Sequence, residues 1–324
     1  MKLRTVSLEE AEGKILCHNI ARPAGGKALK KGQIIGQEEI AALKKLGRET
    51  VLVVELERGD VPEDEAAARL GQAVASTGVQ PGRPTAGKVT LLATHHGLLK
   101  VNVTALTQLN EIEGLAVATL HHNSLVEAKG RVATVKVIPF ALPESALQQA
   151  LSLCCGGQGL IRVTPLKKRR VGLILTGSPQ AEERIVQTFE PAIVGRVADL
   201  GSEVTRVLYV GQDEGEIATA LKGLVGTGVE LIILAGETSV MARRDVTPRG
   251  IELAGGRIEE YGAPVDPGHL FLLAYLDEIP IIGAPGCTRS RKENVVDVVL
   301  PRLLAEERLR RQDIIALGHG GLLP

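Results

Sequence analysis

Aromatic side chains are scarce in this sequence. It has no Trp, and three Tyr and three Phe make up 2% of its 324 residues. Such a chain offers few surfaces on which the bases of single-stranded nucleic acid could stack. The chain also has no excess of charge of either sign, because 38 Lys and Arg are balanced by 38 Asp and Glu. No net charge draws the protein to nucleic acid or to an anionic membrane, so we expect its partners to be recognised locally.

Long apolar runs are absent as well. The sequence has no stretch of about 18 uncharged apolar residues, which is the length needed to cross a bilayer. The first residues, MKLRTVSLEEAEGK, lack the apolar core of a signal peptide. We therefore expect a cytoplasmic protein with no membrane contact. The four cysteines show no metal-ligand spacing, which favours reduced thiols; they are Cys17, Cys154, Cys155 and Cys287.

The pattern of apolar and polar residues changes twice along the chain, which predicts three parts. Residues 1–78 mix short apolar runs with helical periodicity, typical of a small α/β unit. Residues 79–154 show β-branched alternation, which includes LLKVNVTAL and predicts a mainly β segment. The linker signal GGQG then precedes residues 168–324, where strands alternate with helices. This alternation predicts a doubly wound α/β domain with a mainly parallel sheet.

Two motifs outside this last domain suggest ligands but have a simpler explanation. Residues 82–88, GRPTAGK, match the spacing of a phosphate-binding loop, yet Val89 stands where Ser or Thr should follow, and the segment opens a strand. We interpret it as a turn. The pairs His95–His96 and His121–His122 have no carboxylate or thiolate in a recognised metal spacing, and neighbouring strand residues point to opposite faces. Surface or loop histidines are the better interpretation.

Small and acidic residues follow the predicted strands of the C-terminal domain. Ligands bind beyond the carboxyl ends of the strands in such sheets, because loops there present side chains and backbone N–H groups. The small residues would let N–H groups approach an anion, and they are Gly177, Ser178, Gly236, Thr238 and Ser239. A second Gly/Pro loop, GAPGCTRS, adds Pro285, Gly286 and Ser290.

Two acids in these loops are candidates for holding a divalent cation on phosphate oxygens. Asp213 precedes a predicted helix and could equally cap it. Asp245 follows Arg243 and Arg244, so an ion pair with a neighbouring arginine is its alternative role.

At these residues the sequence resembles a known family. RRDVTPRGIE and IPIIGAPGCTRS are similar to motifs of the molybdopterin-binding domain that molybdopterin adenylyltransferases and molybdotransferases share. The segment LKKGQIIGQEEIAALKKLGRETVLVVE is similar to the part of a molybdotransferase before that domain. The resemblance implies that Asp245 and Asp213 act as catalytic and Mg²⁺-binding acids. It also implies that the loop residues, with Glu237 among them, bind the pterin phosphate.

Two departures from the family pattern bear on the chemistry. Glu237 replaces a glycine, which adds negative charge where an anionic ligand would sit, and TGSPQ lacks the Asp-Glu that follows Thr-Gly in relatives. Two hypotheses follow. The protein acts in molybdenum cofactor biosynthesis, binding molybdopterin or adenylylated molybdopterin with Mg²⁺ as a transferase. Alternatively, it is a non-catalytic molybdopterin carrier or sensor.

The resemblance also bears on partners. It implies a small-molecule pterin phosphate as ligand, and it leaves open a homo-oligomer and a molybdoenzyme or biosynthetic partner. A dinucleotide-binding enzyme ranks last, because no G-x-G-x-x-G follows a predicted strand.

Overall fold

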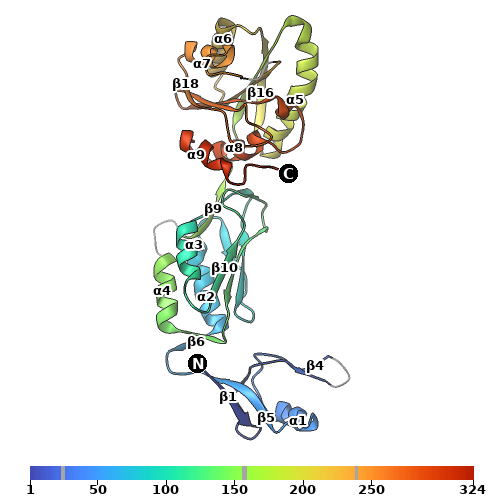
Figure 1. Cartoon of the computed structure of the whole chain (residues 1–324), viewed down its shortest axis with the longest axis vertical. Helices are drawn as coiled ribbons and strands as arrows, with labels where there is room; N and C mark the ends of the chain where they lie inside the picture. The colour runs from blue at the N-terminus through green and yellow to red at the C-terminus, as the bar shows by residue number, and fades with distance from the viewer. Residues whose placement is uncertain (23–25, 155–158, 238–239) are drawn as a thin grey trace. The chain divides into compact units, whose positions relative to one another are not determined.

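The computed structural model describes residues 1–22, 26–154, 159–237 and 240–324. The chain forms two compact units, Met1–Thr164 and Pro165–Pro324 (Figure 1). Whether the first unit divides further at residue 78 stays a prediction. No helix in the described ranges is both long and apolar enough to span a membrane.

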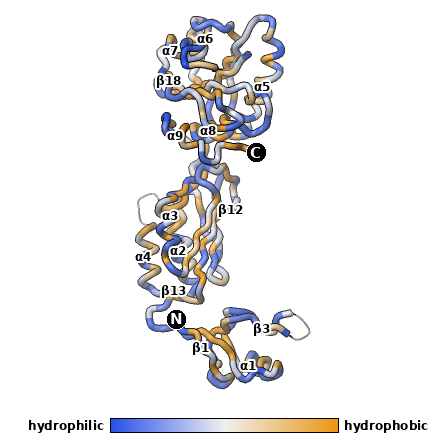
Figure 2. The backbone as a smooth tube through the Cα atoms, in the orientation of Figure 1, coloured by the Kyte–Doolittle hydropathy of each residue, from blue (hydrophilic) through white to orange (hydrophobic). Residues whose placement is uncertain are grey.

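The first unit begins with a small α/β arrangement. Its sheet has the order β1-β5-β2, and β5, orange in Figure 2, buries Val51 and Val53 against Leu43 of α1. Strands and a helix therefore occur together in this part, as the sequence pattern predicts. The elements are β1 Lys2–Ser7, β2 Ile15–Leu16, β3 Ile20–Ala21, β4 Lys27–Leu29, α1 Gln37–Lys45 and β5 Thr50–Glu55.

The rest of the first unit is mainly β, as predicted. Antiparallel strands in the order β10-β12-β8-β7 form its largest sheet, and α2 packs against β8 and β12. Smaller sheets have the orders β11-β9-β14 and β13-β6. The strands are β6 Asp60–Pro62, β7 Val79–Pro81, β8 Lys88–Ala93, β9 Gly97–Val101, β10 Leu115–Thr119, β11 Leu125–Val126, β12 Arg131–Val137, β13 Ala141–Pro143 and β14 Ile161–Pro165. The helices are α2 Glu63–Val74, α3 Val103–Asn110 and α4 Glu144–Cys154.

One predicted strand in this part is only half correct. The pattern LLKVNVTAL predicts a strand throughout, but β9 ends at Val101 and α3 begins at Val103. The Asn102 side chain accepts a hydrogen bond from the Ala105 N–H (3.1 Å), which caps the helix. Burial of Leu109 then holds α3 in place. The cap signal of Asn102 outweighs the β-branched alternation.

The two motifs set aside in the sequence lie on turns. In residues 82–88, Thr85 and Lys88 exchange backbone hydrogen bonds (3.0 and 3.1 Å), and β8 starts at Lys88. The interpretation of GRPTAGK as a turn is confirmed. His95 and His96 lie between β8 and β9, and His96 Nδ1 lies 2.9 Å from Glu127 Oε1.

The second unit contains the doubly wound α/β domain. Among the described residues, its sheet has the order β16-β15-β17-β20-β19-β18. The first four strands of this order are parallel, whereas β19 pairs antiparallel with both β20 and β18. The predicted fold class is therefore confirmed. The strands are β15 Arg170–Thr176, β16 Glu203–Val210, β17 Leu231–Gly236, β18 Arg257–Tyr261, β19 Leu272–Leu276 and β20 Ile279–Gly283.

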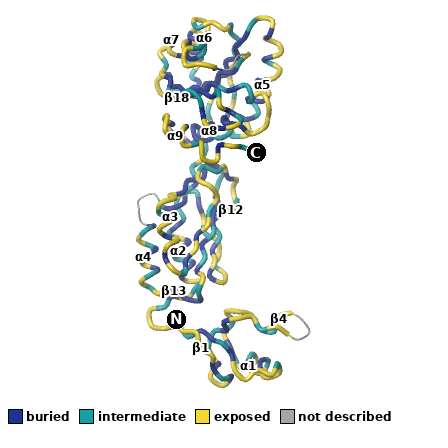
Figure 3. The backbone as a smooth tube through the Cα atoms, in the orientation of Figure 1, coloured by how far each residue is buried: buried dark blue, intermediate teal, exposed yellow. Residues whose placement is uncertain are grey.

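Helices cover both faces of this sheet, because successive residues of a buried parallel strand point to opposite sides. Leu173 of β15 packs in one core cluster with residues of α5 and α8, and Ile174 packs in another with residues of α6 and α7. Figure 3 shows the buried strands in dark blue. The helices are α5 Glu182–Asp199, α6 Glu214–Gly226, α7 Val246–Leu253, α8 Val295–Leu304 and α9 Arg311–Ile315.

Because the second unit has its own core on each face of the sheet, we expect residues 165–324 to fold when produced alone. Circular dichroism should show one cooperative thermal transition for this fragment. A fragment that lacks cooperative unfolding would contradict the independence of the unit.

Candidate functional site

The carboxyl ends of β16, β15, β17 and β20 meet at one edge of the sheet, which we call the ligand edge. The strand order places the loop after β15 between the loops after β16 and β17. The loop after β20 lies next to the loop after β17. The predicted site residues lie at the ends of these strands or after them: Gly177, Ser178, Asp213, Gly236, Glu237, Asp245, Pro285, Gly286 and Ser290. Thr238 and Ser239 lie outside the described residues.

The Glu237 carboxylate accepts three hydrogen bonds at the ligand edge. Its Oε2 accepts hydrogen bonds from the Ser178 N–H (3.0 Å) and from Ser178 Oγ (3.1 Å). Its Oε1 accepts one from Arg184 Nη2 (3.0 Å). The bond from the Ser178 N–H, with Arg184 nearby, holds the pKa of the Glu237 carboxyl below its usual range. An anionic group is thus already bound at the start of the chain segment that leads into α5.

The loop that binds Glu237 is itself held by β16. Tyr209 Oη donates a hydrogen bond to the Ser178 carbonyl (2.7 Å), and the Gly177 N–H donates to the Val210 carbonyl (3.2 Å). Burial, together with the Glu237 charge, raises the pKa of Tyr209. Any side chain at Gly177 would place Cβ 2.5 Å from Tyr209 Oη. Sequence reasoning did not single out Tyr209 or Arg184, although a tyrosine near the end of a predicted strand was a usable signal.

Gly236 lets β17 approach β15 closely. A Cβ at this position would lie 2.1 Å from Thr176 Oγ1 and 2.4 Å from the Thr176 carbonyl oxygen. Beside it is a hollow of about 10 Å³, also lined by Val240, Thr247 and Gly283. That volume is about enough for one water molecule. A larger ligand would therefore lie over the loops rather than within the sheet edge.

Asp213 caps α6. Its Oδ1 accepts hydrogen bonds from the backbone N–H groups of Gly215 (2.8 Å) and Glu216 (3.0 Å). It also borders an open hollow of about 490 Å³ that Tyr209 and Thr219 help to line. The capping role is therefore present, and the side chain still faces a space where a ligand could lie.

Replacing Asp213 by alanine should lower the free energy of unfolding by about 1 kcal/mol, because the first turn of α6 loses its side-chain acceptor. Asparagine should restore most of this loss, since its amide oxygen can accept the same bonds. Urea denaturation measures both variants. Equal destabilisation by alanine and asparagine would contradict a capping role.

Asp245 does not pair with the arginines beside it. Its Oδ2 accepts hydrogen bonds from the backbone N–H groups of Met241 (2.6 Å) and Ala242 (3.1 Å), which closes the turn before α7. Arg243 and Arg244 are exposed, and neither has a carboxylate partner among the described residues. In the described part of this loop, two cationic side chains therefore lack an acidic partner.

The two acids are not assembled into a metal site by the protein alone. Asp213 follows β16 and Asp245 begins α7 after β17, with β15 between these strands. In the described part of the chain, no three His, Cys, Asp or Glu side chains are grouped so as to hold a metal ion. Mg²⁺ usually keeps several waters and binds through one or two carboxylates and phosphate oxygens. The acids therefore fit Mg²⁺ only when a phosphate ligand supplies the remaining oxygens.

The loop after β20 is organised by Arg196, a residue that sequence reasoning missed. Arg196 is 4% exposed, and its Nε donates to Asp297 Oδ1 (2.8 Å). Its other nitrogens donate to the carbonyls of Thr288 (2.9 Å), Ser290 (2.5 Å) and Lys292 (2.7 Å). The only sequence signal was an arginine at a helical spacing that places it on the buried face of α5.

Cys287 lies in the same loop and is half-buried. Burial raises the pKa of its thiol, so the group stays protonated at neutral pH.

The strand order and the helices on both faces define a doubly wound α/β domain, a class of fold that binds ligands beyond the carboxyl ends of its strands. Residues 172–305 match a family model described as a probable molybdopterin binding domain. This match, which covers less than half of the chain, confirms the resemblance found in the sequence. By this domain, the protein is related to proteins of molybdenum cofactor biosynthesis. Residues 5–55 match a model described as a domain of unknown function.

Solved structures give weak likenesses. The molybdopterin biosynthesis MoeA protein from Pyrococcus horikosii is 12% identical, with a TM-score of 0.32 over 94% of this chain and 75% of that chain. A molybdenum cofactor biosynthesis protein from Pyrococcus furiosus is 12% identical, with a TM-score of 0.26 over 97% of this chain and 65% of that chain. MoaB from Thermus thermophilus is 18% identical, with a TM-score of 0.32 over 43% of this chain and 98% of that chain. No curated protein matches the chain.

Proposed function

We propose that the second unit binds molybdopterin, or adenylylated molybdopterin, through its phosphate at the ligand edge. The observation that carries this proposal is the carboxylate of Glu237, which two donors of Ser178 and the guanidinium of Arg184 already hold. Backbone N–H groups and arginines are the donors that phosphates also use. The ligand edge therefore has the chemistry to recognise an anion.

Further cationic groups support a phosphate ligand. Arg243 and Arg244 are exposed in the loop after β17, and no carboxylate neutralises them within the described residues. The loop from Pro285 to Ser290, held from below by Arg196, lies after the adjacent strand β20. A pterin phosphate bound over these loops would therefore contact several cationic groups instead of one.

The proposed activity is nucleotidyl or phosphoryl transfer, the chemistry of the transferases in this family. Asp213 and Asp245 would hold Mg²⁺ against the ligand phosphate, and the metal would neutralise phosphate charge. The backbone N–H groups and arginines of the loops would orient the phosphate oxygens.

A second candidate is a carrier or sensor that binds the pterin without turnover. Glu237 and the missing Asp-Glu in TGSPQ favour it, because both depart from the family pattern, whereas Asp213 and Asp245 favour a transferase. The two candidates share the ligand and differ only in turnover.

Replacing Glu237 by glutamine should tighten the binding of molybdopterin about fivefold, because the amide removes a negative charge and competes less for Ser178 and Arg184. Titration calorimetry measures the change. Glu252→Gln removes an exposed charge elsewhere in the same unit and should leave the affinity unchanged. Weaker binding by Glu237→Gln would mean that the carboxylate itself helps to build the site.

Replacing Asp245 by asparagine separates the enzyme from the carrier. If Asp245 holds Mg²⁺, this variant should lose Mg²⁺-dependent transfer about 100-fold or more and keep metal-free pterin binding. The assay follows nucleotide consumption with molybdopterin present. Measurable parent activity that the variant retains would exclude this role, and an inactive parent that still binds pterin would select the carrier.

A further inference from the structure

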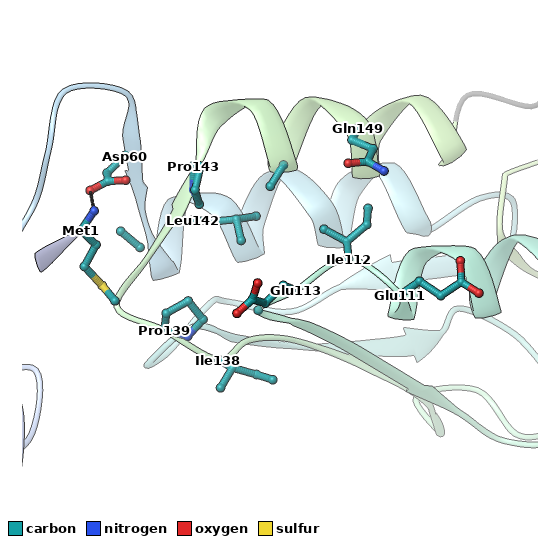
Figure 4. A pocket seen from close by; sticks show the side chains of 13 residues that line it. Met1, Asp60, Glu111, Ile112, Glu113, Ile138, Pro139, Leu142, Pro143 and Gln149 are labelled. Carbon is teal, nitrogen blue, oxygen red and sulfur yellow. Dashed lines mark ion pairs between the residues drawn. The ribbon is translucent and has the colours of Figure 1, made fainter.

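The first unit contains a large hollow that the proposed function does not use. It measures about 860 Å³ and lies between the turn after α3, the segment around β13 and the start of α4 (Figure 4). Ile112 and Leu142 are buried beneath it. Ile138, which is 55% exposed, and Pro139 also line it. An exposed isoleucine beside buried apolar residues forms an apolar surface, and covering it with a partner lowers the free energy.

The rim of this groove is acidic. Asp60, Glu111 and Glu113 line it, and no Lys or Arg does. The Glu111 and Glu113 carboxylates are exposed and have no hydrogen bond or ion pair within the described ranges. Two nearby acids in the same short turn repel each other, so a bound cation would be favoured there. We call this feature the acidic groove.

One end of the acidic groove already holds an ammonium group on an apolar chain. The Met1 amine lies 2.6 Å from Asp60 Oδ2 and 2.8 Å from Glu57 Oε2. Figure 4 shows the Met1 side chain running from this amine toward Pro139. A cation on a carboxylate, followed by an apolar chain on the wall, fits this end. Glu111, Glu113 and Ile138 offer the same pair of surfaces, and no Lys or Arg of the described residues pairs with these two acids.

We propose that the acidic groove binds a basic, apolar peptide segment of a partner protein, with Lys or Arg at Glu111 and Glu113 and apolar side chains on Ile112 and Ile138. Charge complementarity selects a cationic occupant, because Glu111 and Glu113 keep their charge after the Met1 amine has paired with Asp60. Because the groove has apolar surface between its acids, it favours a ligand that alternates basic and apolar side chains, and a peptide can supply both. This proposal does not depend on pterin binding by the second unit.

Fluorescence anisotropy with the full chain tests the proposal. The probe is a short fluorescein-labelled peptide of alternating Lys and Leu, compared with the same peptide carrying Glu for Lys and with one carrying Ser for Leu. We expect saturable binding of the Lys/Leu peptide alone. The double variant Glu111→Gln/Glu113→Gln should weaken it about tenfold at low salt, and less at high salt. Ile138→Ser should weaken it about fivefold at either salt concentration.

A matched control separates the groove from general attraction to a negative surface. Glu9→Gln/Glu10→Gln removes the same charge from two other exposed acids of the first unit and should change the affinity less than about twofold. Equal weakening by both double variants would overturn the proposal, as would equal binding of the Ser-substituted peptide. Hexylammonium that binds as tightly as the peptide would also overturn it, in favour of a small cation. Circular dichroism checks that each variant is folded.

Discussion

Replacing Arg196 by methionine is expected to lower the free energy of unfolding of the second unit by about 3 kcal/mol, because the change removes a buried guanidinium together with its ion pair to the partly buried Asp297 and its hydrogen bonds. The guanidinium bonds Asp297 and the carbonyls of Thr288, Ser290 and Lys292. The Thr288 carbonyl would lose its donor in a buried position, and Asp297 and the carbonyls of Ser290 and Lys292 would lose theirs in partly buried positions. The loop from Pro285 to Ser290 should become disordered at the same time.

Guanidinium denaturation of residues 165–324 measures this effect. Arg206→Met is the matched control, because Arg206 is exposed on the edge strand β16, and it should change stability by less than about 0.5 kcal/mol. Arg196→Lys keeps the charge but not the planar fork of donors, so it should recover only part of the loss. A loss for Arg196→Met within about 1 kcal/mol would show that the loop does not depend on this residue.

Replacing Gly236 by valine is expected to cost about 3 kcal/mol and to abolish ligand binding at the edge. The new Cβ would lie 2.4 Å from a backbone oxygen of Thr176, so β15 and β17 would have to move apart. That movement would also separate Ser178 from Glu237, whose bond joins the two loops.

Gly223 provides the control for this variant. It lies on the exposed face of α6, and nothing is within 4 Å of the Cβ that a substitution would add. Gly223→Ala should stabilise the unit by about 0.5–1 kcal/mol, because alanine favours a helix. Thermal denaturation and a phosphate titration measure both variants. Valine at position 236 that retains parent stability would contradict the close approach of the strands.

The fold of the second unit could be predicted because its pattern is local. Apolar runs of strand length, such as Leu231–Gly236, alternate with helical segments. Strands joined by helical crossovers of this kind form a parallel sheet. The edge at which the ligand should bind follows from the same rule. Asp213 could also be identified as a helix cap, because an acid directly precedes the helical segment.

The partners of individual side chains could not be predicted, because they depend on strand order. Glu237 meets Ser178 only since β17 lies next to β15, although the two residues are far apart in sequence. Arg196 bonds a loop that follows almost a hundred residues later, and no local pattern specifies that contact. From sequence, the charge of Glu237 predicts repulsion of an anion. The structure adds the donors that hold its carboxylate in place.

Titration of the full chain with molybdopterin, with and without Mg²⁺, tests the central proposal most directly when repeated on Arg243→Gln/Arg244→Gln. The control is Lys168→Gln/Lys222→Gln, which removes the same charge from exposed sites of the second unit. We predict saturable binding by the parent, about tenfold weaker binding by the arginine variant and no change in the control. Absence of binding by the parent, or equal affinity in all three proteins, would contradict a pterin phosphate site at the ligand edge.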